Sequence, residues 1–190
     1  METVVEFKDV SKKYSNLSVL EHAELSVKQD DFMVIYGLPS SGKTVLSRLL
    51  MGLEEPDAGD IIVRGENVRH MPPKVRNIGY VPQDFALIPH KTIFENIAYP
   101  LRLMRKSTLE IKPVVQRAAS MLNIEELLDK LPSLLIGGQI QRVGVARCIV
   151  KESDIYLFVD TLAGLDFILR EKLIDDLKRL QEDLAACFIY

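Results

Sequence analysis

The chain has 190 residues, of which 47% are hydrophobic and 27% are charged, and its formal net charge is -3. This length and apolar content predict one compact domain with a full core. The slight acidic excess argues against a nucleic-acid partner, and the longest apolar run, residues 155–159, is far shorter than the roughly 20 residues of a membrane helix.

The first 81 residues are predicted to form mainly strands, interrupted by one short helix. Two early segments partly alternate between apolar and polar residues, whereas residues 31–36 form a continuous apolar run, typical of a strand buried on both faces. The helix begins near Lys43 and is ended by Gly52. The predicted strands are residues 4–10, 19–27, 31–36, 60–63 and 78–81.

The rest of the chain is predicted to be mostly helical. Residues 92–151 have helical patterns with breaks at Pro113, near Pro132 and at Gly137. A second buried strand follows, then an amphipathic helix and the start of another buried strand, at residues 155–159, 167–183 and 185–190. Buried strands that alternate with helices predict an α/β fold with a mostly parallel sheet. Cys148 and Cys187 match no metal or redox spacing, and we expect both to be buried, reduced thiols.

A glycine-rich loop stands between the strand at residues 31–36 and the following helix. Its sequence, GLPSSGKT, fits the pattern G-x-x-x-x-G-K-[ST], in which backbone N–H groups and a helix N-terminus bind phosphates. In such a loop the lysine lies near the β- and γ-phosphates and the last hydroxyl near Mg²⁺. A chance glycine turn is the alternative, but the flanking strand and helix favour a nucleotide site. Its residues are Gly37, Pro39, Ser40, Ser41, Gly42, Lys43 and Thr44.

Further motifs follow in a fixed order along the chain. YVPQ ends at Gln83, LLIGGQ is followed by QRV and AR, an apolar strand ends at Asp160, and AGLD comes next. This series resembles the nucleotide-binding domain of ATP-binding cassette (ABC) transporters over essentially the whole chain, most closely the importers of the maltose/multiple-sugar type and their relatives. The resemblance implies a P-loop NTPase core with an antiparallel β subdomain and a helical subdomain at about residues 88–152, within one domain of residues 1–190.

The resemblance also implies roles for single residues in binding ATP and Mg²⁺. Tyr14 falls where the family stacks an aromatic ring on adenine, although a packed tyrosine is the alternative. Gln83 occupies the position that senses Mg²⁺ and the attacking water, and Asp160 the position that holds the metal. The implied metal ligands are Thr44, Gln83 and Asp160.

Two kinds of protein partner follow from the same resemblance. Gly137, Gly138 and Gln139 match a loop that contacts ATP bound to the opposite subunit, which implies a head-to-tail dimer. Residues 85–89, from Phe85 to Pro89, fall where the family binds a coupling helix of its membrane permease, and plain core packing is an equal alternative for each of them. The implied location is cytoplasmic, peripheral on the inner face of the cell membrane.

Three departures from the family bear on hydrolysis. The catalytic glutamate is replaced by Thr161, whose hydroxyl cannot act as a base near neutral pH, and loss of a general base costs about 10²- to 10⁴-fold. The signature serine is replaced by Ile136, which removes a hydroxyl donor to the γ-phosphate. The family's switch histidine would follow the strand near Cys187, and the chain ends at Tyr190 before any such residue. We therefore expect ATP binding with strongly impaired hydrolysis.

Several functions fit this pattern. The first is the ATP-binding subunit of an importer that couples ATP binding to solute transport. The others are a regulatory nucleotide-binding module without hydrolysis and the degenerate half of an asymmetric ABC pair. A soluble ABC protein of repair or translation fits less well, because those proteins join two cassettes or carry long insertions. A truncated gene product is the simplest alternative.

Overall fold

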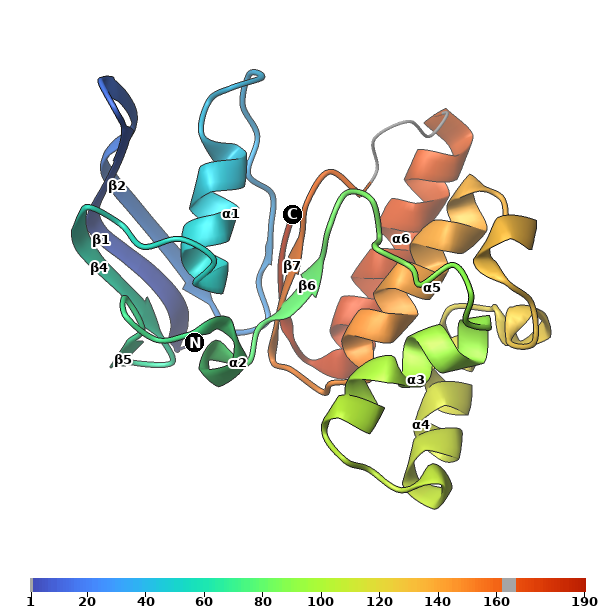
Figure 1. Ribbon diagram of the computed structural model, residues 1–190. Helices are drawn as coiled ribbons and strands as arrows, with labels where there is room; N and C mark the ends of the chain where they lie inside the picture. Colours follow the sequence, from blue (N-terminus) through green and yellow to red (C-terminus); the bar gives the residue numbers. More distant parts are fainter. Residues whose placement is uncertain (1, 162–166) are drawn as a thin grey trace. The chain divides into compact units, whose positions relative to one another are not determined.

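The computed structural model describes residues 2–161 and 167–190, which divide into two units (Figure 1). The first unit contains the described residues up to Ile78, together with Asp154–Val159 and Leu184–Tyr190. The second contains Gly79–Ser153 and the described part of Asp160–Asp183. The predicted extent of a single domain and of its helical subdomain stays a prediction.

An antiparallel sheet makes up much of the first unit (Figure 1). The central strand β1 pairs with β2 on one side and β4 on the other, so that Phe7 lies opposite both Leu25 and Ile61. Because alternate side chains of a strand point to opposite faces, Val5 and Phe7 are both buried on the core side. The strands, in the order β2-β1-β4-β5, are β1 Thr3–Tyr14, β2 Leu17–Lys28, β4 Ala58–Val63 and β5 Glu66–Asn67.

Three parallel strands form the other layer of the first unit. They are β3 (Phe32–Met33), β8 (Cys187–Ile189) and β7 (Ile155–Phe158), with β8 between the other two. The ring of Phe188 in β8 packs on rings of both neighbouring strands, with centroids 4.9–6.0 Å apart. The parallel and antiparallel sheets confirm the predicted α/β class.

The predicted strand at residues 31–36 is wrong in its length and burial. Regular pairing covers only the two residues of β3, after which a single backbone bond runs from Ile35 N–H to Tyr190 O at 2.6 Å. Among the described residues of this unit β3 has a partner on one side only, so Val34 and Tyr36 beyond it are exposed. An apolar run was therefore a poor guide to burial at the edge of the sheet.

The first unit also contains the predicted helix α1 (Lys43–Met51) and a short helix α2 (Pro73–Arg76). Gly52 ends α1 in the left-handed conformation, with φ 72°, and its N–H donates to the carbonyls of the last turn. This is the ordinary role of a glycine just after a helix, and it confirms the predicted end of α1.

The second unit is mainly helical. Capping boxes begin two of its helices, at Thr92 with Glu95 and at Ser107 with Glu110. Helices α3, α4 and α5 pack on one another. Its elements are β6 Gly79–Val81, α3 Ile93–Leu103, α4 Thr108–Met121, the 3₁₀ helices η1 Glu125–Leu127 and η2 Pro132–Leu134, α5 Gly137–Ile149 and α6 Phe167–Leu184. In the ranges that the structure describes, no helix is both long and apolar enough to cross a bilayer.

The predicted break at Pro113 is wrong, because α4 continues through it. A proline within a helix removes the N–H that would bind the carbonyl four residues earlier, here that of Leu109. Leu109 is highly exposed, so water can reach this side of the first turn. The capping box at Ser107 gives the start of α4 two further hydrogen bonds.

Both cysteines are buried and free. Cys148 lies in α5 and Cys187 in β8. Burial raises the pKa of each thiol to about 12. The thiols are therefore protonated and unreactive at neutral pH, as the sequence predicts.

Candidate nucleotide-binding site

The loop that precedes α1 has the conformation its glycines allow. Gly42 is the N-cap residue of α1 with φ 92°, and Ser40 has φ 63°. A Cβ atom at Gly42 would lie 3.0 Å from Leu20 Cδ2 and 3.1 Å from the carbonyl oxygen of Val19. Both the positive φ and the close approach of β2 therefore favour glycine at this position.

Lys43 ties the two ends of this loop together. Its ammonium Nζ donates to the carbonyl oxygens of Gly37 and Leu38, each at 2.8 Å, and lies 3.5 Å from Ser41 Oγ. A Cβ atom at Gly37 would lie only 2.7 Å from Ser41 Oγ. The loop is thus closely folded around a positive charge that an anion can approach.

The N-terminus of α1 is open to an anion. Gly42 offers no side-chain cap, and the first turn contains no acidic residue. The unpaired N–H groups and the positive end of the helix dipole are therefore not neutralised from within α1. Thr44 is exposed beside them. Phosphate oxygens are the ligand type that such a site binds.

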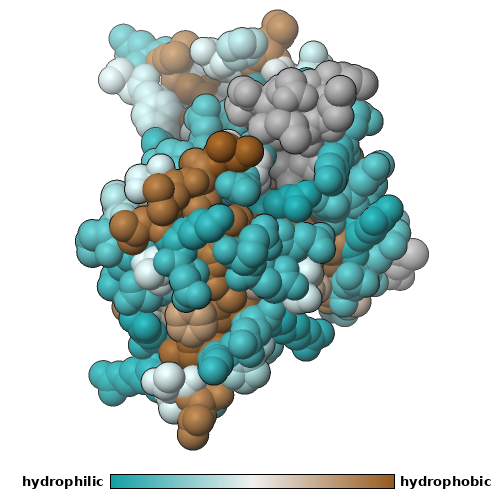
Figure 2. Space-filling view, turned by 90° about the vertical axis from the view of Figure 1, so that its right-hand side faces the viewer, coloured by the Kyte–Doolittle hydropathy of each residue, from teal (hydrophilic) through white to brown (hydrophobic). Residues whose placement is uncertain are grey.

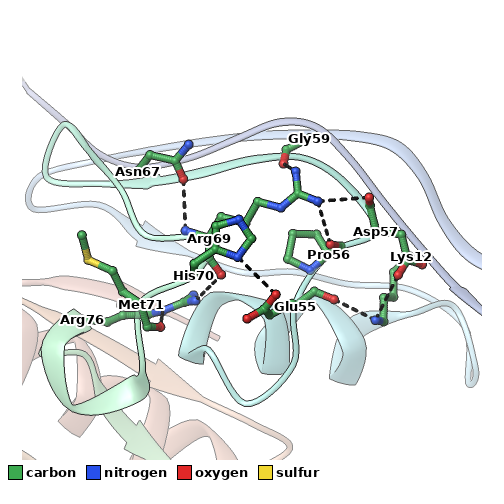
Figure 3. Close-up of polar contacts among 10 residues, drawn as sticks. All are labelled: Lys12, Glu55, Pro56, Asp57, Gly59, Asn67, Arg69, His70, Met71 and Arg76. Atoms are coloured by element: carbon green, nitrogen blue, oxygen red, sulfur yellow. Dashed lines mark hydrogen bonds and ion pairs between the residues drawn. The ribbon is translucent and has the colours of Figure 1, made fainter.

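A buried arginine holds the opposite end of α1. Arg76 is only 2% exposed, and its guanidinium donates to the carbonyls of Leu49 at 2.6 Å and Leu50 at 2.9 Å. It also donates to Met71 O at 2.9 Å and Arg69 O at 3.2 Å (Figure 3). Burial lowers the pKa of Arg76, but a guanidinium keeps its charge in proteins. The last carbonyls of a helix are short of helical partners. Arg76 donates to that of Leu50 and gives that of Leu49 a second donor beside the Gly52 N–H at 3.1 Å.

Arg69 fixes the adjoining chain in the same way. Its guanidinium donates to the carbonyls of Pro56, Asp57 and Gly59 at 2.9–3.1 Å (Figure 3). These carbonyls belong to the segment that leads from α1 into β4. The chain beyond the phosphate loop is therefore held by two arginines, and neither was predicted as a functional or core residue.

Tyr14 lies at the end of β1, with its side chain fixed by charged neighbours. Its hydroxyl donates to the carboxylate of Glu54, which accepts a second bond from Arg48 at 2.9 Å. The Lys12 ammonium lies over the ring, 5.6 Å from its centroid. Tyr14 is 41% exposed, so part of its side chain is open to solvent, and its predicted role stays a prediction.

In the second unit, Gln83 is exposed in a loop whose backbone is hydrogen-bonded to a side chain of α5. The next residues, Phe85 and Ala86, both have positive φ, 53° and 43°. Arg147 donates to both of their carbonyls, at 2.7 Å for Ala86. Two successive left-handed residues without glycine are costly, and Arg147 stabilises this turn.

Gly144, one turn before Arg147 in α5, makes room for the Phe85 ring. A Cβ atom there would lie 2.7 Å from Phe85 Cδ1. We expect Gly144→Ala to lower the free energy of unfolding by about 1–3 kcal/mol, because the ring must shift. Urea unfolding measures this. Gly138→Ala is the matched control in the same helix, since nothing lies within 4 Å of its Cβ position. Equal stability of the two variants would contradict the prediction.

The predicted signature residues lie at the start of α5. Gly137 and Gly138 open the helix, and no described residue lies within 4 Å of their Cβ positions. The Gln139 side chain accepts a bond from the N–H of Ile136 at 3.2 Å. Ile136 is 72% exposed, so an apolar side chain stands at this helix N-terminus.

Asp160 and Thr161 follow β7 but differ in exposure. Asp160 is exposed with φ 49°, whereas Thr161 is 1% exposed. The carbonyl of Thr161 accepts a bond from Gln141 Nε2 in α5 at 2.7 Å. Within residues 2–161 and 167–190, the Thr161 hydroxyl and Gln141 Oε1 have no hydrogen-bond partner. Thr161 is therefore held in the interior of its unit. The predicted AGLD motif, residues 163–166, lies outside the described residues.

The predicted site residues thus belong to both units. The phosphate loop and Tyr14 lie in the first unit, where β2 contacts Gly42. Gln83, Asp160 and the signature residues lie in the second. The first unit by itself contains an uncapped helix N-terminus, a lysine in the loop before it and an exposed aromatic ring.

This combination is that of a nucleotide-binding domain, and the sequence places it in a family. The chain belongs to the ABC transporter family, whose profile matches residues 20–161. Its ATP-binding domain is the part to which the chain corresponds.

The chain is also similar to individual proteins of this family. The spermidine/putrescine import ATP-binding proteins PotA of Pasteurella multocida and Haemophilus influenzae are each 39% identical over 187 residues. The same protein of Thermotoga maritima is 38% identical over 186 residues. Each alignment covers 98% of this chain and 50% of the relative, so the chain spans about half the length of the curated relatives it matches.

Two solved structures share the fold. The chain is similar to cbiO1 of Clostridium perfringens, part of the ABC transporter complex cbiONQ, with a TM-score of 0.92 and 24% identity over 100% of this chain and 78% of that one. It is also similar to the ATP-binding cassette MJ0796 bound to ADP and Pi, a dimer, with a TM-score of 0.85 and 27% identity over 97% and 86%. These likenesses confirm the predicted fold of an ABC nucleotide-binding domain.

Proposed function

We propose that this chain is the ATP-binding subunit of an ABC importer, which couples ATP binding to solute transport through membrane permease subunits. The observation that carries the proposal is the phosphate loop. Lys43 crosses it, and the N-terminus of α1 has neither a side-chain cap nor an acidic residue. This geometry binds a triphosphate, and the import ATP-binding relatives supply the transport role.

The chemistry of the proposed metal ligands, taken residue by residue, suits Mg²⁺. Thr44, Gln83 and Asp160 are all exposed and carry oxygen atoms, which Mg²⁺ prefers as ligands. In the part of the chain that the structure describes, no group of three or more His, Cys, Asp or Glu is arranged to hold a metal. An ion that also binds phosphate oxygens and water needs no such group. When bound, Mg²⁺ would neutralise phosphate charge.

We propose partners on two surfaces of the second unit. Gly137, Gly138 and Gln139 would contact ATP of a second subunit in a head-to-tail dimer, and residues 85–89 would contact a permease at the inner face of the membrane. Figure 2 shows apolar side chains gathered in places on an otherwise hydrophilic face. Among the residues of this unit whose burial the structure describes, the large exposed apolar ones are Tyr99, Leu103, Met104, Leu109, Leu131, Leu134 and Ile136.

Equilibrium binding of Mg-ATP by the purified chain tests the first step of this proposal. We expect saturable binding at one site per chain, with AMP binding far more weakly because it lacks the β- and γ-phosphates. Uptake in cells that lack this chain tests the transport role. Spermidine and putrescine are the first solutes to assay, because the similar proteins PotA are spermidine/putrescine import ATP-binding proteins. Equal affinity for AMP and ATP would contradict the assignment of the phosphate loop.

A second function, one half of an asymmetric pair or a module that binds without hydrolysis, is favoured by two residues. Thr161 is buried and has no carboxylate, and Ile136 presents an apolar side chain at the start of α5. Both features weaken hydrolysis and leave the phosphate loop intact. A partner cassette with a glutamate and a serine at these positions would supply what is missing.

Hydrolysis is expected to be slow and to respond to a carboxylate at residue 161. We expect Thr161→Glu to raise the steady-state turnover of ATP by about 10²-fold or more, the usual contribution of a general base. Burial at this position would raise the pKa of the new carboxyl group towards neutral pH, which suits a base. Thr161→Gln has nearly the same shape without the base, and it should stay slow. Rapid ATP turnover by the unaltered chain would refute the idea that hydrolysis is slow because residue 161 lacks a carboxylate. Equal turnover rates for the Glu and Gln variants would refute it as well.

A further inference from the structure

We propose that Glu54 is a positioning residue for the base of the bound nucleotide, because it holds the Tyr14 ring in the orientation on which the base stacks. The inference rests on the proposed ATP site and extends it to a carboxylate that no motif contains. Glu54 follows α1 and lies 40 residues from Tyr14 along the chain.

The β1–β2 hairpin, which carries Tyr14, also contacts the phosphate loop. In the β1–β2 hairpin, Lys12 stands two residues before Tyr14 and pairs with Leu20 on β2. The Leu20 side chain lies 3.0 Å from the Cβ position of Gly42, in the phosphate loop itself. The Tyr14 ring, which is 41% exposed on the same hairpin, is available to receive a base, since every base has a face that stacks on aromatic side chains.

Glu54 connects this ring to the phosphate-binding helix. One carboxylate oxygen accepts the Tyr14 hydroxyl, and the other accepts Arg48 Nη1 at 2.9 Å. Arg48 lies in the last turn of α1, the helix that begins at Lys43. The hydrogen bond raises the pKa of Tyr14 and lowers that of Glu54, so the phenol remains the donor and the carboxylate the acceptor at neutral pH.

Lys12 supports the ring from one face. Its ammonium lies 5.6 Å from the ring centroid and is itself held by the carbonyl of Glu55 at 2.7 Å and by Asp57 Oδ1 at 3.4 Å. With the hydroxyl fixed and one face covered, the opposite face is the one a base can use. The ring then loses little rotational freedom when the base stacks, which favours binding.

Two variants test this role by comparing ATP with inorganic tripolyphosphate, each with Mg²⁺. Tyr14→Phe keeps the ring without its hydroxyl, and Glu54→Ala removes the acceptor. We expect each to weaken ATP binding about 3- to 10-fold, the range for one hydrogen bond, and to leave tripolyphosphate binding unchanged. Glu54→Gln keeps an acceptor oxygen and should stay within about 2-fold of the unaltered chain. Glu6→Ala, which breaks an ion pair with Lys8 on the same strand, is the control.

The double variant separates positioning from a general loss of structure. Because both changes break one bond, Tyr14→Phe with Glu54→Ala should weaken ATP binding no more than either change alone. Equal losses for ATP and tripolyphosphate would mean that Glu54 only stabilises the fold, and no loss for either variant would also overturn the proposal. Failure of the ATP site itself is recognised separately, by the absence of tripolyphosphate binding in the unaltered chain.

Discussion

Lys43→Ala is expected to raise the dissociation constant for Mg-ATP at least about 100-fold. The ammonium is the one side-chain cation that bonds to the phosphate loop among the described contacts, and it donates to the carbonyls of Gly37 and Leu38. A hydrogen bond to a charged group is worth about 1.5–3 kcal/mol, and a triphosphate offers the ammonium more than one. The variant also leaves the two loop carbonyls without this donor. Titration calorimetry measures the affinity.

Lys43→Arg is the control for charge alone. It keeps the positive charge but replaces a compact ammonium with a planar guanidinium, which cannot make the same pair of 2.8 Å bonds in this closed loop. We expect an intermediate loss of affinity, about 10-fold or more. Unchanged ATP affinity in the alanine variant, with the fold intact by circular dichroism, would show that the nucleotide does not bind at this loop.

The second large effect is expected on stability, from Arg76. We expect Arg76→Met to lower the free energy of unfolding by roughly 3–5 kcal/mol, because four main-chain carbonyls, two of them buried, each lose a hydrogen bond from the guanidinium. Two of these carbonyls, of Leu49 and Leu50, end the helix that carries the phosphate site. Denaturant unfolding followed by circular dichroism measures the loss.

Two further variants test whether the loss of stability in Arg76→Met comes from the buried bonds of its guanidinium. Arg76→Lys keeps the charge but not the fork of donors, and it should still lose about 2 kcal/mol. Lys8→Ala removes an exposed cation paired with Glu6 in the same unit and should change stability by less than about 1 kcal/mol. If Arg76→Met were as mild as Lys8→Ala, the bonds from the guanidinium to these carbonyls would contribute little to stability, and this explanation of Arg76 would be wrong.

The parts of the fold that could be predicted are those in which neighbouring residues determine the structure. The phosphate loop is read from eight consecutive residues, and its flanking helix begins and ends at Lys43 and Gly52 as expected. The amphipathic pattern likewise predicted α6. The family's motifs predicted the α/β fold with its antiparallel and helical parts, since they occur in a fixed order along the chain.

The rest depends on contacts between residues far apart in the sequence. Arg76 stands in a segment of charged residues and prolines that is typical of a surface, and only the fold shows that α1 ends against it. Two other contacts are of the same kind. Tyr14 donates a hydrogen bond to Glu54, and Arg147 donates to the loop after Gln83. Residues 31–36 show the opposite error, because an apolar run does not reveal how many strands lie beside it.

The two buried thiols have a practical consequence for studying conformational change. With a pKa of about 12, each of Cys148 and Cys187 is ionised in roughly one molecule in 10⁴ at pH 8, and neither is accessible. Maleimide probes would therefore leave the natural sequence unlabelled. A single cysteine placed at exposed Ile136 or Tyr36 would carry a fluorophore or spin label without first removing the native ones. Such labels would test the proposed dimer by distance measurements between two copies of the chain as ATP is added.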